Sequence, residues 1–461
     1  MLKSNIAWMK KNVPSDLKVW KGMIQDIDWS QVAAKTKLSL QRDKDRITAE
    51  FKEFAAMDTS AKIDWLMNGD RHLGYLYKKD AIAFARREWK GLKSVGYDFV
   101  GWLKIWGGML NMVMKDPMSI MLAVFEYHWF ASYLATPAVV DRSVFGRRGK
   151  LLQADFDMWV AITHWAEDLI ANLIMADAKI GGNQKINKRI IMFDEMTMAQ
   201  MMAGFPNLLG IPYQMIPVFM VSEMDQLTLI PYIDAIESYG LPSDTCPLPT
   251  AECGCAVKDE YPMCGQGFIA SSMPCDGSVM ATSFQDRRFS KFMPSYPLCM
   301  PVRYDDEDTT EMAAADMKDC IHWVEGLTGE TWNWDTYFAT MEKMNECTRL
   351  EMEKWEINKT HYPQLVGSSF ELFRKWNYEM DGGLFPEGLK TQRKICKTMM
   401  ETYEKKLPAY VGGYEKYRAL IWSCPAHFYA NFSNWLANCW GIYALTEMEA
   451  LNMTKMLNTT D

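Results

Sequence analysis

Five of the chain's eleven cysteines fall within thirty residues, in the stretch "SDTCPLPTAECGCAVKDEYPMCGQGFIASSMPC"; they are Cys246, Cys253, Cys255, Cys264 and Cys275. Proline, glycine and charged residues separate them, so most are expected on loops. Thiolates gathered on loops suit zinc or an iron–sulfur cluster. The spacing matches neither a zinc-finger pair nor a ferredoxin run, and no histidine pair is close in sequence. Spacing alone therefore leaves metal binding and structural thiols as alternatives.

Position in the predicted elements favours two of these thiols as metal ligands. Cys275 stands between a predicted strand, "GFIASSM", and a helix that begins at about Asp276. Ligands of open parallel sheets bind outside the carboxyl ends of strands, and helix N-termini stabilise thiolates. Cys246 occupies the equivalent place after a helix closed by Gly240, and Cys424, in "IWSCPAHF", repeats the arrangement. The alternative for each is a buried core cysteine, which behaves as a small apolar residue.

The remaining cysteines are expected to be structural. Cys299 is predicted to point sideways from the middle of a strand, and four others lie on amphipathic helices: Cys320, Cys347, Cys396 and Cys439. In "HWAE", His164 and Glu167 could share one helix face, as ligands do in di-iron bundles. The pattern occurs once and in reversed order, so a structural role is expected there as well.

The elements that must position these residues divide the chain into four parts. Residues 1–188 read as a helical region, and residues 189–308 alternate short apolar strands with amphipathic helices. This second part includes strands at "RIIMF", "PYQMIPVF", "GFIASSM" and "YPLCMPV". Residues 309–415 read as an inserted helical segment, and residues 416–461 as the start of a second, incomplete α/β unit. We therefore predict an α/β fold of doubly wound, Rossmann-like units with parallel sheets.

Composition limits the classes of partner. The net charge is −8 and no basic run interrupts the mixed-sign pattern, so we expect no nucleic-acid partner. The N-terminus has no apolar signal-peptide core, which indicates a reducing cytoplasm, where grouped cysteines more often serve metal or redox chemistry. "SIMLAVFEYHWFASYLATPAVV", 119–140, could span a bilayer, but it contains Glu126, His128 and Pro137. A buried or subunit-facing helix is therefore expected instead.

Several stretches resemble a known family in their order along the chain. They are "LGIPYQMIPVFMVSEMD", "LPSDTC", "SSMPCDGSVMATSF" and "YRALIWSCPAHFYANF". Together they are similar to the large subunits of the 2-hydroxyacyl-CoA dehydratase and benzoyl-CoA reductase family. The resemblance covers about residues 189–461, and residues 1–188 look like an added region.

The resemblance implies one [4Fe-4S] cluster per subunit, held by three cysteines. Cys246 and Cys275 correspond to two of these ligands. The third would come from a late part of the second α/β domain that this sequence does not reach. The chain is therefore a fragment, or a neighbouring cysteine such as Cys264 substitutes, or the cluster is absent. Cys253 or Cys255 could also substitute.

The resemblance also implies the partners and the reaction. They are a homologous second subunit, an ATP-dependent iron–sulfur activator and an acyl-CoA substrate. The reaction is an oxygen-sensitive dehydration or reduction, a lyase or oxidoreductase activity, through a ketyl radical made by one low-potential electron. Two alternatives stay open: a non-catalytic scaffold subunit without a cluster, and a double-cluster reductase of small molecules that would use the extra cysteines.

Overall fold

The computed structural model describes residues 21, 25, 28–69, 91–144, 147–194, 199–224, 226–242, 245–271, 276–299, 301, 306–364, 373, 376–377, 381–407, 409, 415–421, 436–447 and 456–460. Its contacts divide the chain into two compact units, Met1–Asp70 and Arg71–Asp461. The first unit holds the helices α2 (Trp29–Ala56) and α3 (Thr59–Asn68). Asp28 and Asp58 cap them by accepting hydrogen bonds from backbone N–H groups of the first turn, which satisfies donors that have no partner within a helix.

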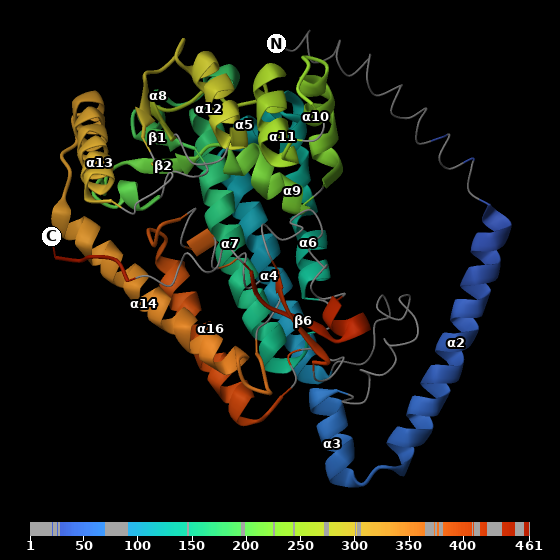
Figure 1. Ribbon diagram of the computed structural model, residues 1–461. Coiled ribbons are helices and arrows are strands. Elements are labelled where there is room, and N and C mark those ends of the chain that lie inside the picture. The colour runs from blue at the N-terminus through green and yellow to red at the C-terminus, as the bar shows by residue number, and fades with distance from the viewer. Residues whose placement is uncertain are drawn as a thin grey trace. The chain divides into compact units, whose positions relative to one another are not determined.

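Two long helices, α4 (Leu92–Lys115) and α7 (Gly149–Ala176), lie side by side in the second unit (Figure 1). Glycines on α4 allow the close approach: a Cβ atom built at Gly101 would lie 2.3 Å from Cδ1 of Phe156 on α7. A Cβ at Gly108 would lie 2.2 Å from Oε2 of Glu167. The prediction of a helical region before residue 188 is confirmed for the described residues.

Glu167 brings a carboxyl group into this helix interface. Its side chain is 7% exposed, and its two carboxyl oxygens accept no hydrogen bond within the described structure. Burial raises the pKa of this carboxyl group to about 8, although the positive charge of Lys115 lowers the pKa in part. His164, one turn earlier, instead contacts Glu387, with 3.3 Å between Nδ1 and Oε2. A Cβ atom built at Gly108 would also lie 2.9 Å from Cδ2 of His164, so the pair in "HWAE" shares the face of α7 that lies against α4. Among the described residues no third His, Cys, Asp or Glu side chain joins the pair closely enough to hold a metal ion.

Glu167→Gln should make the protein's stability less dependent on pH. The unfolded carboxyl group ionises near its ordinary pKa of 4.5, whereas the folded one keeps its proton until about pH 8. Unfolding therefore releases a proton in this range, and wild-type stability falls as pH rises from about 4.5 to 8. At pH 8 we expect the variant to be more stable than wild type by about 1–3 kcal/mol, with little difference at pH 5. Thermal melts at both values measure this, with Glu311→Gln at an exposed position of α13 (Glu307–Thr328) as the control; equal gains at both pH values would contradict it.

The apolar segment 119–140 is divided among three short helices. α5 (Pro117–Glu126) ends at Tyr127, a 3₁₀ helix, η3, follows (His128–Ala135), and α6 (Thr136–Ser143) completes the run. Trp129 and Phe130 are fully buried, so the expectation of a buried segment is confirmed in its middle. None of the described helices is long and apolar enough to cross a bilayer.

A four-stranded parallel sheet forms the centre of the second unit. Its strands are β1 (Ile190–Phe193), β2 (Leu209–Pro212), β3 (Gly267–Ser271) and β4 (Ser295–Leu298), in the order β2-β1-β3-β4. β1 and β3 are buried at every position, as parallel strands covered on both faces must be. The alternation between faces is visible in β1, where Ile190 and Met192 pack with α7 while Ile191 and Phe193 pack in a separate cluster.

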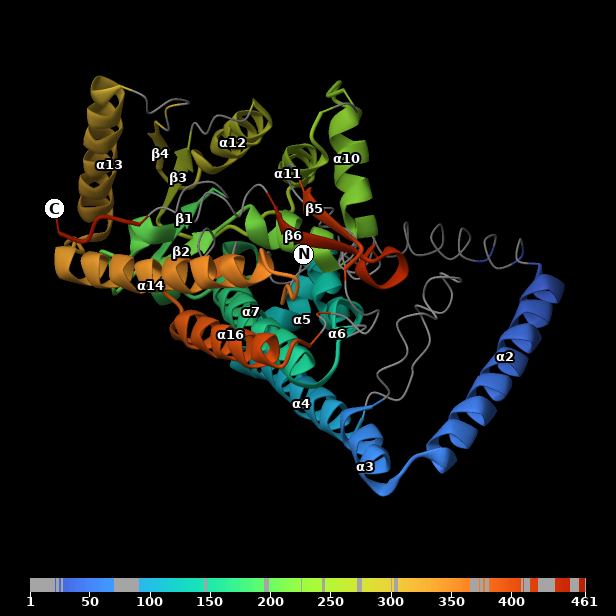
Figure 2. The ribbon, with the colours of Figure 1, turned by 60° about the horizontal axis from the view of Figure 1, so that its bottom comes forward.

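Helices cover both faces of this sheet. One face packs against α7, α11 (Pro247–Val257) and α12 (Asp276–Phe289), and the other against α13 (Glu307–Thr328) (Figure 2). The shorter elements α8 (Gln184–Asn187), α9 (Met220–Met224) and α10 (Ile230–Glu237) belong to the connections. The chain is thus a mostly helical α/β protein with small parallel sheets, as the alternation predicted.

The strand predicted at "PYQMIPVF" is wrong. β2 ends at Pro212, and Met215–Phe219 form a π-helical turn. The segment is apolar on all sides, since Ile216 and Val218 are both fully buried, so its periodicity could not separate a strand from a helical turn. Pro217 also lacks the N–H group that an interior strand donates to its neighbour.

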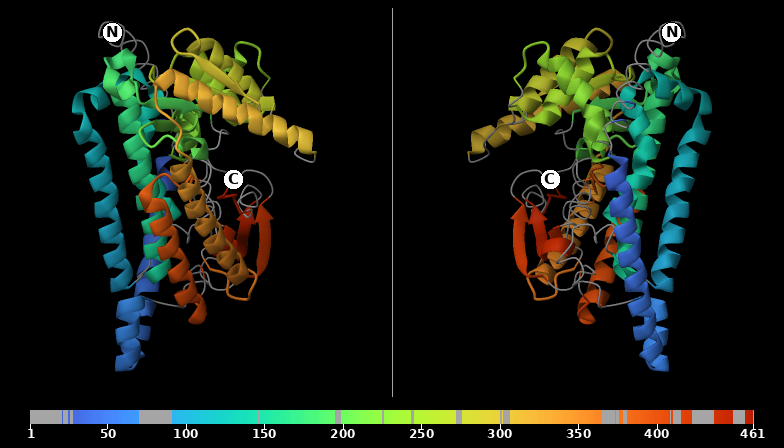
Figure 3. Two further views of the ribbon diagram at one scale, coloured as in Figure 1. Left: turned by 90° about the vertical axis from the view of Figure 1, so that its left-hand side faces the viewer. Right: turned by 90° about the vertical axis from the view of Figure 1, so that its right-hand side faces the viewer.

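The later part of the chain contains long helices and a second sheet. α14 (Trp334–Asn358) packs against α16 (Pro386–Glu404), which in turn packs on α7. β5 (Tyr417–Ile421) and β6 (Ile442–Glu447) then form a parallel pair (Figure 3), which agrees with the predicted strands "RALIWS" and "IYALTEM". The boundaries at residues 188, 308 and 415 stay divisions by sequence pattern, while the contacts place α7, the first sheet and α16 in one unit.

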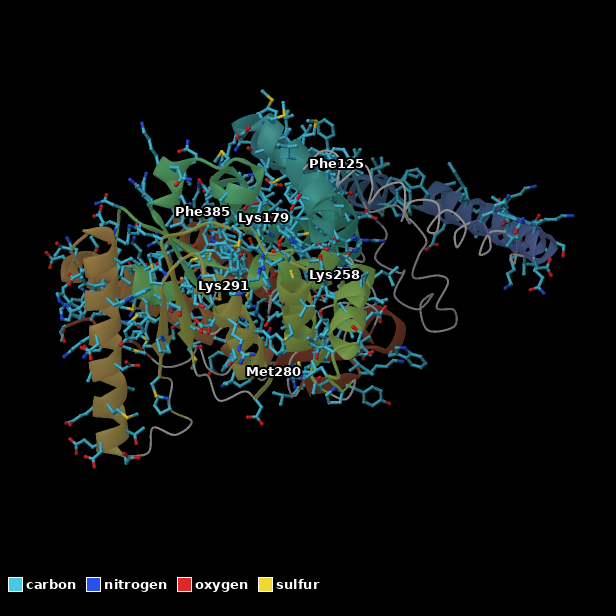
Figure 4. The ribbon with its side chains drawn as sticks, turned by 90° about the horizontal axis from the view of Figure 1, so that it is seen from above. Phe125, Lys179, Lys258, Met280, Lys291 and Phe385 are labelled. Atoms are coloured by element: carbon cyan, nitrogen blue, oxygen red, sulfur yellow. The ribbon has the colours of Figure 1, made fainter. Side chains whose placement is uncertain are left out.

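The segment that follows α11 is held by residues from the N-terminal helices. Asp177, fully buried, accepts hydrogen bonds from the hydroxyl of Tyr127 and from the backbone N–H of Met263. Lys179, labelled in Figure 4, donates from Nζ to Oδ1 of Asp259 over 2.7 Å. These contacts fix the end of α11 that points away from Cys246, and they explain why α7 and the sheet share a core.

Candidate functional site at the carboxyl edge of the first sheet

The order of the strands defines where a ligand would bind in this sheet. From β1 the chain moves outward to β2 and then returns to the other side of β1 to form β3. The connections after β1 and after β3 therefore leave in opposite directions, and the crevice between them is the usual ligand site of an open parallel sheet. Asp194 follows β1 directly and Ser271 ends β3, so both lie at this carboxyl edge.

Asp194 ties the two strand ends together. Its Oδ2 accepts hydrogen bonds from the backbone N–H of Ser271 over 2.5 Å and from the Ser271 hydroxyl over 2.8 Å. The Asp194 side chain is 1% exposed. Charge-assisted hydrogen bonds of this kind are short and stronger than neutral ones, so the carboxylate fixes the point from which residues 272–275 continue.

The N-termini of α11 and α12 also lie at this edge. α12 begins five positions after the last residue of β3, and α11 ends before the amino end of β3, so both helices run opposite to the strands. They pack against each other, and Cys253 of α11 shares a buried cluster with Ala281 of α12. Cys246 precedes Cys253 by seven residues, and Asp276 precedes Ala281 by five. At 1.5 Å per residue these are rises of about 10 Å and 8 Å, so the two helix starts are nearly level.

Cys246 is exposed at the N-terminus of α11. It is the N-cap residue, with φ −55° and ψ 126°, and Pro247 occupies the first helical position. The hydroxyl of Thr250 donates to the Cys246 carbonyl over 2.7 Å and holds the first turn. The positive end of the helix dipole stabilises a thiolate here, and the thiolate is the form that binds metal. The sequence placed Cys246 only after the helix closed by Gly240, so its position as the N-cap of α11 is a finding of the structure.

Glycine at position 254 sets how closely α11 approaches α10. A Cβ atom there would lie 1.9 Å from the backbone oxygen of Tyr232. The backbones of the two helices are therefore in direct contact at this point, next to Cys253 and Cys255. This contact fixes the position of α11 and hence of Cys246 at its start.

Cys253 and Cys255 lie on α11 and not on loops, so that expectation is wrong. The prolines that suggested a loop, Pro247 and Pro249, stand in the first turn of the helix, where their missing N–H groups cost nothing. Both thiols are fully buried. Burial raises the pKa of Cys253 to about 12 and the pKa of Cys255 well above its usual range. These thiols stay protonated and act as core residues.

Cys264 lies at the other end of α11 from Cys246. It precedes β3 at the amino edge of the sheet, is 2% exposed, and its Sγ contacts Sδ of Met192 at 3.7 Å. Burial raises the pKa of its thiol well above the usual range. The structure therefore does not bring Cys264 together with Cys246, because the eleven residues of α11 separate them by about 16 Å.

Cys299 is the thiol that the sequence placed incorrectly. The predicted mid-strand core residue instead follows the last residue of β4 and is exposed. Its backbone N–H donates to Oδ2 of Asp316 over 2.6 Å. It therefore lies at the same carboxyl edge as Cys246, and the signal that marks it is the end of an apolar run immediately before it. Cys320, Cys347 and Cys396 are buried, as predicted.

Two predicted positions, Cys275 and Cys424, lie outside the described residues, as does the side chain of Cys439. Within the described part of the chain, no three His, Cys, Asp or Glu side chains gather closely enough to hold a metal ion. The donor set that can be examined at the carboxyl edge is thus Cys246 with Cys299. Cys275 joins it by sequence, as the residue before Asp276. Exposed thiols such as those of Cys246 and Cys299 are soft ligands, which suit an iron–sulfur cluster in their chemistry.

The strand order defines an α/β protein with a parallel sheet, and in such proteins the carboxyl edge is where ligands usually bind. Comparison with known families then identifies the family within this class. The profile of the family "2-hydroxyglutaryl-CoA dehydratase, D-component" matches residues 226–460, just over half of the chain. The chain belongs to this family, which confirms the resemblance seen in the sequence. The match includes α11, β3 and α12 and begins after "LGIPYQMIPVFMVSEMD". No curated protein matches the chain.

Proposed function

We propose that this chain is the cluster-binding subunit of an iron–sulfur-dependent 2-hydroxyacyl-CoA dehydratase. Cys246 and Cys275 would hold the [4Fe-4S] cluster, and the first α/β unit would be of the doubly wound, Rossmann-like type. The observation that carries the proposal is the exposed Cys246 thiol at the start of α11, level with the start of α12, within the region that matches the dehydratase family.

The chain's own residues would prepare the site. The helix N-terminus beneath Cys246 favours its thiolate, and Asp194 fixes the strand end that precedes Cys275. When bound, a cluster of this type supplies one-electron chemistry and a Lewis-acidic iron. The buried thiols of Cys253 and Cys255 would stay protonated and keep α11 in place.

A third thiol from this chain would most simply come from the same edge. Cys299 meets this condition because it is exposed at the end of β4. Cys264 does not meet it in this arrangement, because it lies at the amino edge and is buried. Cys299 is therefore the substitute that we propose to test first, ahead of Cys264.

The family's name describes one component of a dehydratase, so a partner subunit within a complex follows from membership. We propose that the partner is a homologous subunit, that an ATP-dependent iron–sulfur activator delivers the electron, and that the substrate is an acyl-CoA thioester. A reductase of the benzoyl-CoA type would use the same site. A scaffold subunit without a cluster is the alternative from another class.

Iron and acid-labile sulfide analysis of the anaerobically purified chain tests the proposal directly. We expect about four irons and four sulfides per chain, with the absorbance of an iron–sulfur cluster that bleaches on exposure to air. A folded chain that contains no iron after anaerobic reconstitution would contradict the proposal and favour the scaffold alternative. About eight irons would instead favour a double-cluster reductase.

A further inference from the structure

The outer side of α4 and α5 exposes an unusually continuous apolar surface, which we call the α4–α5 face. Twelve large apolar side chains on it are between 37% and 66% exposed: Leu92, Val95, Phe99, Val100, Leu103, Trp106, Leu110, Met114, Met118, Met121, Val124 and Phe125. Figure 3 shows α4 along the outer side of α7, and Figure 4 labels Phe125. With side chains of this size, the face amounts to on the order of 1,000 Å² of apolar surface, above the largest patch of a typical monomer.

The residues of α4 on this face follow a heptad repeat. Leu92, Gly96, Phe99, Leu103, Trp106 and Leu110 alternate in steps of four and three, and all six are exposed. This 3.5-residue spacing is typical of the seam between two helices of a coiled coil. Attachment to a membrane surface requires no such repeat, so the spacing favours a helix as the occupant of the face.

Glycines on the two sides of α4 support the same conclusion. On the inner side, Gly101 and Gly108 admit the side chains of α7. On the outer side, a Cβ atom built at Gly96 or Gly107 would meet nothing within 4 Å. These two glycines are three helical turns apart and so share a face. Each costs about 1 kcal/mol of helix stability relative to alanine, a cost that close approach of a second helix would offset.

We propose that the α4–α5 face is the interface between two copies of this chain, with the two α4 helices parallel about a two-fold axis. The face is large enough, because a standard interface needs about 800 Å² from each partner. It is also self-complementary in this orientation. A parallel, in-register pair sets the residue that precedes Gly96 or Leu103 against the residue five positions later in the other copy. Trp102 then faces the second copy's Gly107, and Val95 faces Val100.

The charges on α4 favour the parallel orientation over the antiparallel one. Lys93 and Lys104 lie eleven residues apart along one edge of the helix, and Lys115, eleven residues further on, pairs with Asp168 of α7. An antiparallel pair would bring the lysine-bearing edges of both copies together. A parallel pair sets that edge beside the opposite edge of its neighbour, which carries Val95 and Trp102.

The mass of the chain in solution tests the interface. We expect wild-type protein to have about twice its 53.2 kDa mass by light scattering at micromolar concentration. Leu103→Glu would place a carboxylate from each copy in the seam and should raise the dissociation constant by about 100-fold or more. Because Leu103 is 59% exposed, the variant should keep its melting temperature at concentrations where both proteins are monomeric. Lys104→Glu, one position outside the seam, is the matched control and should stay dimeric.

Cysteine crosslinking tests the orientation. In a parallel pair, Gly96→Cys, Leu103→Cys and Leu110→Cys should each form a covalent dimer on oxidation, above the level of wild type and of Lys104→Cys. The proposal is overturned by a monomeric wild-type chain, by a dimer that Leu103→Glu leaves intact, or by crosslinking at only one of the three positions. Binding to phosphatidylglycerol vesicles that Leu103→Glu abolishes, with no dimer in their absence, would assign the face to lipid instead. Crosslinks from position 103 to residues 29–56 of the same chain would likewise overturn it.

Discussion

Cys246→Ala should remove the iron from this protein without unfolding it. Anaerobically reconstituted wild-type chain is expected to hold about four irons, and the variant fewer than one, because an exposed thiol at a helix N-terminus cannot be replaced by a methyl group as a ligand. Dehydratase activity of the reconstituted complex should fall by about 100-fold or more. The side chain is exposed and contributes little to the core. The variant should therefore have the same melting temperature as wild-type protein whose iron has been removed by a chelator.

Cys253→Ala is the matched control for this experiment. It removes the same atom from the same helix, seven residues away, but from a fully buried position. We expect it to keep its iron and to lose about 1 kcal/mol of stability, since a small cavity replaces the sulfur. The two variants should therefore show opposite patterns of iron content and stability. If Cys246→Ala kept its full iron content, Cys246 would not be a ligand; Cys299→Ala then shows whether the thiol at the end of β4 contributes.

Gly254→Val should be the most destabilising single substitution at the site. Its Cβ would lie 1.9 Å from the backbone oxygen of Tyr232 and 2.4 Å from the carbonyl carbon. Backbone atoms cannot move away as a flexible side chain can, so α10 and α11 would have to separate. We expect a loss of at least about 3 kcal/mol in the free energy of unfolding, measured by urea denaturation.

Gly326→Ala provides the control for helix propensity. Gly326 lies within α13, and a Cβ atom there would meet nothing within 4 Å. This substitution should stabilise the protein by about 0.5–1 kcal/mol, because alanine loses less backbone freedom on folding. If Gly254→Val hardly changed the free energy of unfolding while Gly326→Ala raised it as expected, α11 would not be held against α10 as described. Iron analysis of any folded Gly254→Val protein would then report whether the start of α11 is displaced.

The local pattern of the sequence determined most of the elements near the site. Short apolar runs at residues 190–193 and 267–271 are buried on both faces, so they require no alternation and still indicate parallel strands. The amphipathic segment from Asp276 and the Gly240 stop were also readable, because helix ends carry their own residue preferences. From these elements alone, Cys246 could be placed after the helix that Gly240 closes, whereas the helix α11 that begins after Cys246 was not predicted.

The tertiary structure decided which cysteines share an edge. The strand order β2-β1-β3-β4 places the starts of α11 and α12 together and leaves Cys264 about the length of a helix away. The sequence treated Cys253 and Cys255 as loop residues, because prolines mark both loops and first helical turns. Cys299 was predicted in the middle of a strand, but the strand β4 ends one residue before it. These distinctions depend on burial and on pairing between distant segments, which arise only when the helices pack on the sheet, whereas helix and strand formation follow from residues close together in the chain.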